Sequence, residues 1–141
     1  MKIFYQILSI ATLVAVLVGC CNCRAVQKNR KPLAGCEWQL VQLGGETIQP
    51  EEGKYTIQFI EEEQLFAGVG ECNRITANYS TNEKGELKLE YAGMTRMMCP
   101  NQEAEDRFVE MLNKVTRYDM DGAMLMLFEK DNLLAVFQAK E

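Results

Sequence analysis

The stretch ITANYST-NEKG-ELKLEYA, residues 75–92, decides the fold class of this chain. Its first run, 75–81, and its last run, 86–92, alternate apolar and polar residues with a period of two. That period is expected of a strand with one buried face. The four residues between them, 82–85, include asparagine and glycine, which favour a tight turn. The stretch therefore predicts a β-hairpin and, with it, an antiparallel sheet.

Further short runs of this kind lie on both sides of the hairpin. They are bounded by turn residues, and the additional predicted strands are 37–43, 54–60, 64–69, 116–120, 123–130 and 133–140. The runs 124–128 and 133–137 are apolar on both faces, so we expect them in a barrel or sandwich that is covered on its outer side.

One segment has the pattern of a helix. Pro100 breaks the strand pattern, and Asn101 is a good N-cap for a segment whose first turn is acidic. The apolar residues of this segment recur at helical spacing and would form one stripe on a helix; they are Ala104, Phe108, Met111, Leu112 and Val115. We therefore expect an α+β fold: an antiparallel β-barrel or sandwich-like sheet of about seven or eight strands, with one helix of about four turns covering it.

The N-terminus has the features of an export signal. Lys2 is followed by a largely apolar run, 3–18, and the sequence Leu-Val-Gly-Cys at 17–20 resembles the lipobox of bacterial lipoproteins. We expect cleavage before Cys20 and a lipid on its thiol, which would anchor the protein to a bacterial membrane, facing the periplasm or exterior. The alternative is an uncleaved membrane-spanning anchor.

These features divide the chain into three parts. We expect a signal peptide at 1–19, a lipidated cysteine with a basic linker at 20–32, and a single globular domain at 33–141. The linker either lies against anionic lipid headgroups or acts as a solvated spacer. The domain has 20 acidic and 10 basic residues, a balance that disfavours nucleic acid as a partner.

The chain contains no histidine. It contains 20 acidic residues, and its formal net charge is −5. Catalytic pairs of the Ser-His or Cys-His kind are therefore excluded. With no recognisable catalytic constellation, we expect a protein that is not an enzyme and has no cofactor. Its partners would be the membrane, through the lipid, and an unknown envelope protein or small ligand.

Two separated motifs resemble the META/HslJ-like family. The strongest is Gly-Val-Gly-Glu-Cys-Asn-Arg at 68–74, followed by Tyr79, and the second is Met-Thr-Arg-Met-Met-Cys at 94–99. The opening Leu-Ala-Gly-Cys-Glu-Trp-Gln-Leu at 33–40 is also similar. The chain departs from the family at Glu71 and two residues before the tyrosine, where the family has glycine.

This resemblance implies an antiparallel barrel or sandwich-like α+β domain with one helix. It also implies stress-response or envelope associations rather than a defined reaction. Because Cys72 and Cys99 both belong to the family motifs, we expect them to form a disulfide; the alternative is two buried free thiols.

The same motifs contain the candidate binding residues, which are Asn73, Arg74, Thr95 and Arg96. An arginine suits an anion or a partner carboxylate, whereas Asn73 has the alternative role of bonding the backbone and holding its turn in shape.

Methionine is abundant near Cys99, at Met94, Met97 and Met98. Thioethers and thiolates together suit Cu(I), so the alternative function is a copper-handling stress protein. Elsewhere in the chain, methionine is expected to fill gaps in the core. We predict no metal site.

Overall fold

The predicted hairpin is formed by β5 (Arg74–Thr81) and β6 (Leu87–Met94), which pair in antiparallel register with Tyr79 opposite Leu89. The register shifts near the end of the hairpin, between the pairs of Thr76 and Ala77, which marks a β-bulge.

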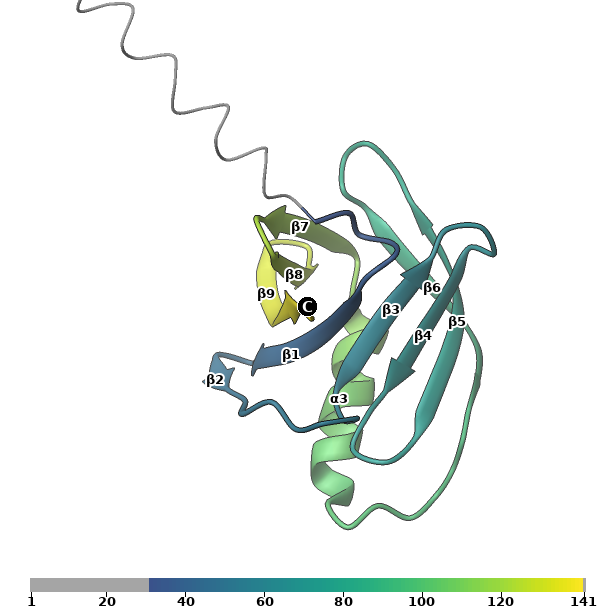
Figure 1. Cartoon of the computed structure of the whole chain (residues 1–141), viewed down its shortest axis with the longest axis vertical. Helices are drawn as coiled ribbons and strands as arrows, with labels where there is room; N and C mark the ends of the chain where they lie inside the picture. Colours follow the sequence, from purple (N-terminus) through teal and green to yellow (C-terminus); the bar gives the residue numbers. More distant parts are fainter. Residues whose placement is uncertain (1–30, 141) are drawn as a thin grey trace, which may run out of the picture. The chain divides into compact units, whose positions relative to one another are not determined.

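The computed structural model describes residues 31–140, and their arrangement is drawn in Figure 1.

The other strands extend this hairpin into one sheet. They are β1 (Glu37–Leu43), β2 (Glu46–Thr47), β3 (Thr56–Ile60), β4 (Leu65–Val69), β7 (Arg117–Asp121), β8 (Met124–Glu129) and β9 (Asn132–Ala139). The sheet order is β6-β5-β4-β3-β1-β9-β8-β7, with β2 paired to β1, and every pairing is antiparallel. The predicted fold class is confirmed. Only β2, whose two residues are exposed, was not expected.

The two end strands of this order meet at one end, so the sheet is nearly closed into a barrel. Glu86 bridges to Arg117 between β6 and β7. The N–H of Leu87 donates to the carbonyl of Thr116 at 3.0 Å, and the N–H of Tyr118 donates to the carbonyl of Gly85 at 2.8 Å. No backbone hydrogen bond of the described residues continues this seam beyond Leu87 along β6.

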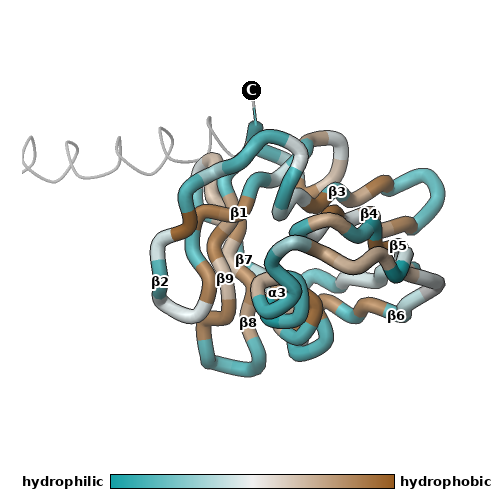
Figure 2. Tube along the Cα trace, turned by 90° about the horizontal axis from the view of Figure 1, so that it is seen from below, coloured by the Kyte–Doolittle hydropathy of each residue, from teal (hydrophilic) through white to brown (hydrophobic). Residues whose placement is uncertain are grey.

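The helix α3 (Gln102–Lys114) begins as predicted, since the side chain of Asn101 accepts a hydrogen bond from the N–H of Ala104 at 3.1 Å. Its position differs from the prediction that it covers the outer side of the last strands. Figure 2 shows α3 at the open side of the barrel, between β8 and β6.

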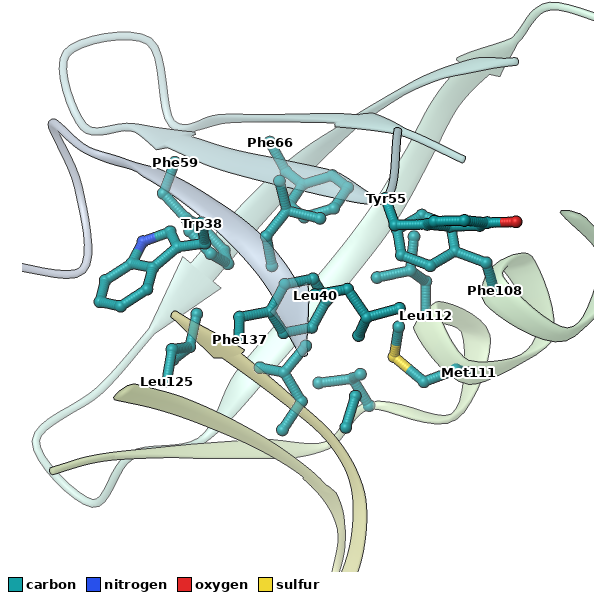
Figure 3. Packing of buried hydrophobic residues seen from close by; sticks show 14 of the residues in the cluster. Trp38, Leu40, Tyr55, Phe59, Phe66, Phe108, Met111, Leu112, Leu125 and Phe137 are labelled. Atoms are coloured by element: carbon teal, nitrogen blue, oxygen red, sulfur yellow. The ribbon is translucent and has the colours of Figure 1, made fainter. Parts of the chain in front are cut away.

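The apolar stripe of α3 faces the barrel interior. Phe108, Met111 and Leu112 point toward the inward-facing Leu40 and Phe137 in Figure 3, and the rings of Phe108 and Phe137 have centroids 6.5 Å apart. The physical reason is the short seam between β6 and β7, which leaves the interior open and therefore favours an apolar plug. The prediction of an outer cover was wrong.

The first described residue lies far from the start of α3. Lys31 donates its N–H to the carbonyl of Gly122, at the turn between β7 and β8, at 3.2 Å. The segment leading into α3 lies at the opposite end of the domain (Figure 1). Cys20, the predicted signal peptide and nearly all of the predicted linker lie outside the described residues. Within 31–140 no helix is both long and apolar enough to span a bilayer.

Candidate functional site

A disulfide joins the two family-like motifs. Cys72, in the connection between β4 and β5, is bonded to Cys99, just before α3, with their Cα atoms 5.6 Å apart. The predicted pairing is confirmed, and the alternative of two free thiols is wrong. Because the bonded cysteines are 27 residues apart in sequence, closing this loop contributes about 3 to 4 kcal/mol in the chain-entropy treatment.

Asn73 holds the segment before α3 against the sheet. Its side chain is buried, its Nδ2 donates to the carbonyl of Met97 at 3.1 Å and to Sγ of Cys99 at 3.3 Å, and its Oδ1 accepts from the N–H of Met97 at 2.7 Å. The same Oδ1 accepts from the hydroxyl of Thr95 at 2.9 Å. Both polar atoms of Asn73 are thus used within the domain, which fits the structural alternative for this residue.

Thr95 is part of the same network. Its Oγ1 accepts a hydrogen bond from the N–H of Arg74 at 2.9 Å while its hydroxyl proton is donated to Asn73. Two of the four candidate binding residues, Asn73 and Thr95, therefore position the other two.

Arg74 and Arg96 are exposed, and within residues 31–140 neither guanidinium makes a salt bridge. They border different hollows. Arg74 lies on the sheet surface near Gln58 and Thr76, beside a hollow of about 370 Å³. Arg96 borders a hollow of about 390 Å³ between the segment before α3 and the helix itself. The structure thus connects Asn73, Thr95 and the backbone of Arg74 in one hydrogen-bond network, places Arg96 directly after Thr95, and separates the two cationic groups between two surfaces.

The hollow beside α3 has mixed chemistry, and we call it the helix groove. Its lining residues are Asn73, Met94, Arg96, Met97, Gln102, Glu105, Asp106, Val109, Glu110 and Asn113. Met94 and Met97 are 41% and 56% exposed, values that are high for apolar side chains in a domain with a well-formed core. Acidic residues come from α3, so the groove has an apolar rim and an acidic helical wall.

A buried carboxylate that sequence reasoning missed fixes α3 to the sheet. Glu105 is 1% exposed, and its Oε2 accepts hydrogen bonds from the N–H groups of Glu71 and Cys72. Gly70 lies directly over this carboxylate, where any Cβ would collide with Oε2. Within the described residues Oε1 of Glu105 has no hydrogen-bond partner. The signal in the sequence was Gly70, whose missing side chain makes the space.

Glu71 explains the departure from the family motif. Its buried carboxylate accepts from the hydroxyl of Tyr55 through Oε2 and from Nζ of Lys54 through Oε1 at 2.8 Å. The hydrogen bond from Lys54, followed by that from Tyr55, lowers the pKa of Glu71 below its usual range. Burial and the Glu71 carboxylate raise the pKa of Tyr55 far above its usual range. The added side chain therefore joins the start of β3 to the connection between β4 and β5.

Fold and site together define a small antiparallel barrel domain, closed by one helix and stabilised at the helix start by a disulfide. A family model described as the META domain matches residues 31–141, and the chain belongs to this family. No protein with a curated description matches the chain in sequence.

Solved structures share this fold. A DUF4847 family protein from Bacteroides vulgatus is 17% identical with a TM-score of 0.57, over 75% of this chain and 93% of that one. A protein from Burkholderia xenovorans, solved by NMR, is 21% identical with a TM-score of 0.56, over 84% and 88% of the two chains. A further NMR structure is 24% identical with a TM-score of 0.57, over 75% and 90%. These likenesses concern the fold alone.

Proposed function

We propose that this META-domain protein is an envelope lipoprotein, anchored through Cys20, whose domain is a binding or stress-response module rather than an enzyme. The observation that carries the binding role is an exposed surface whose backbone is held in place by several bonds. The disulfide and the four hydrogen bonds of Asn73 hold the backbone around Met97, while Arg96 and Met97 stay exposed. A surface ordered before binding loses less conformational entropy when a partner docks.

The non-enzymatic part of the proposal is supported by how the buried polar groups are used. Both oxygens of the buried Glu71 carboxylate are used, by the hydroxyl of Tyr55 and by Nζ of Lys54, so this group connects two segments of the fold. A catalytic acid or base would instead be expected to face substrate in a cleft.

The anchor is tested by replacing Cys20 with Ala and by replacing the neighbouring Cys21 with Ala as the matched control. We expect the full chain to incorporate a metabolic fatty-acid label and to stay with membranes in the wild type and in Cys21→Ala. Cys20→Ala should lose both the label and the membrane association. A labelled Cys20→Ala variant, or an unprocessed and unlabelled wild type, would contradict the anchor.

The binding role is tested by affinity capture from envelope fractions with the lipidated chain. We expect the Arg74→Ala, Arg96→Ala variant to lose the captured component. The matched control is Lys84→Ala, Arg107→Ala, which removes two exposed cations elsewhere on the domain. Equal capture by both variants would exclude Arg74 and Arg96 from the binding surface.

A second candidate, Cu(I) handling, is favoured by one observation. Met94, Met97 and Met98 are 41%, 56% and 95% exposed, and the first two border the same groove. Thioether sulfurs are suitable ligands for Cu(I). Titration with Cu(I) in ascorbate should show binding that is lost when the three are replaced by Leu and kept in Met111→Leu, whose side chain is in the core. Identical isotherms for all variants would remove this candidate.

A further inference from the structure

Within residues 31–140, the strand β6 has an edge with no strand paired to it along most of its length, at the open side of the barrel where α3 also lies. In the sheet order β6 stands at one end, and its seam with β7 is limited to the neighbourhood of Glu86 and Leu87. Beyond Leu87, the outer edge of β6 receives no backbone hydrogen bond from the described residues.

The direction of the unpaired groups follows from two hydrogen bonds. Leu87 donates its N–H away from β5, to Thr116, and Tyr79 donates its N–H away from β6, to Gln64, at 2.9 Å. Tyr79 is opposite Leu89 in the ladder. Because backbone groups alternate in direction along a strand, the N–H and C=O of Leu89 and of Tyr91 also point away from β5. Two residues thus present unpaired donors and acceptors at the outer edge of β6.

Two hollows lie at the two ends of this free edge. One, of about 670 Å³, is bordered by Lys88 and Leu89 of β6 and by Val115 at the end of α3. The other is the helix groove, bordered by Met94 at the end of β6. An extended chain that pairs with β6 therefore finds space for side chains at both ends of the free segment.

The charge of the surroundings indicates which chain would fit. On the helix side of the groove lie Asp106 and Glu110, together with the buried Glu105, whose Oε1 has no partner in the described part of the chain. Glu110 is paired with Lys114, and Arg96 is the one cationic residue among those lining the groove. The excess at this end of the edge is negative, and it favours a lysine or arginine on the part of the incoming segment that meets the helix groove. The hollow at the other end is bordered by Lys88, Arg117 and Lys130 with only Glu86 as an acid, so the basic residue is expected at the helix-groove end.

The edge also carries features that limit what can pair with it. Lys88 and Glu90 form an exposed ion pair, and the bulge near Tyr91 interrupts the regular ladder. Charges and bulges are known devices against open-ended sheet association. They leave a short regular segment that suits a short peptide better than another long strand.

From this geometry we infer that β6 is a docking edge, on which a short extended segment of another exported protein, bearing a basic residue, adds as a strand through the backbone of Leu89 and Tyr91. This is the recognition mode in which main-chain hydrogen bonds provide affinity and neighbouring hollows provide specificity. The inference rests on the proposed binding role, but it depends neither on the lipid anchor nor on Arg74.

The test uses the full chain in detergent micelles, with a phage-displayed random decapeptide library as the probe and an enriched peptide then synthesised. We expect enriched peptides to alternate apolar residues with a lysine or arginine. We also expect the peptide to slow hydrogen exchange at the amides of Leu89 and Tyr91. Methylating the peptide amides that face β6 should weaken binding about tenfold or more, whereas methylating the alternate amides should change it less than about threefold.

A charge test accompanies the backbone test. Asp106→Lys, Glu110→Lys should weaken the basic peptide about tenfold, while Glu61→Lys, Glu62→Lys, with the same charge change at the remote β3–β4 turn, should have less than about a threefold effect.

Four results would overturn the inference. These are no enriched peptide, protection that excludes Leu89 and Tyr91, insensitivity to methylation, and concentration-dependent protection of this edge without peptide, which would show that a second copy occupies it. If envelope capture still depends on Arg74 and Arg96 while any of these results is found, the binding role stands and the docking edge is wrong.

Discussion

Replacing Gly70 with Ala should destabilise the domain far more than an ordinary glycine substitution. The new Cβ would collide with the carboxylate of Glu105, which is fixed by the N–H groups of Glu71 and Cys72. The backbone of Gly70 does not have a positive φ, so alanine is compatible with its conformation. The whole effect should therefore come from the displaced carboxylate.

The magnitude follows from what Glu105 loses. Hydrogen bonds to an ionised group contribute about 1.5 to 3 kcal/mol each, and two of them connect Glu105 to the β4–β5 connection. We expect Gly70→Ala to lower the free energy of unfolding by about 3 kcal/mol or more. The matched control is Gly93→Ala, whose Cβ meets only Oγ1 of Thr76, at 3.9 Å, and should change stability by less than about 1 kcal/mol.

A double-mutant cycle identifies the cause. When Glu105 is first replaced by Ala, the space beneath Gly70 is open, and Gly70→Ala should then cost less than about 1 kcal/mol. Urea unfolding of the full chain with its disulfide intact measures all four proteins. Equal costs of Gly70→Ala in the two backgrounds, or a cost no larger than that of Gly93→Ala, would refute the close contact between Gly70 and Glu105.

Three further predictions concern the same end of the domain. Reducing the Cys72–Cys99 disulfide, or replacing both cysteines by Ala, should lower stability by about 3 kcal/mol, measured by urea unfolding. Because the folded-state pKa of Glu71 is lowered, its contribution should be present at neutral pH and lost as the pH falls through that lowered pKa; Glu71→Gln should flatten this acid dependence of the melting temperature. Asn73→Ala should accelerate hydrogen exchange at the amide of Met97, because this N–H donates to Oδ1 of Asn73. Unchanged protection of that amide would contradict the role of Asn73 in holding the segment before α3.

The strands were predictable because alternation is a local property. The 37–43 run became β1 without change, and the boundaries of the other predicted strands moved by at most two residues. The side of the sheet on which α3 lies was not predictable. Its apolar stripe requires an apolar surface, but an open barrel interior satisfies that requirement as well as an outer face does.

The site was predictable only where a motif named its residues. Cys72, Cys99 and Asn73 belong to the family-like motifs, and the structure brings them into contact. The burial of Glu105 was not predicted, because an acid in the first turns of a helix is already explained by the helix dipole. Gly70 is the one signal for it, and a glycine does not indicate which residue fills the space beside it. The partners of Glu105 are backbone N–H groups, which have no sequence signature.

The strongest tertiary connections outside the apolar core converge on one end of the domain. The disulfide, Asn73 and Glu105 all join the β4–β5 connection to the segment that leads into α3 or to α3 itself. Three different kinds of bond thus hold a segment whose own side chains, Met97 and Met98, remain exposed. Under the proposed binding role, this fixation keeps the exposed segment in one conformation before a partner docks, so that less conformational entropy is lost on binding.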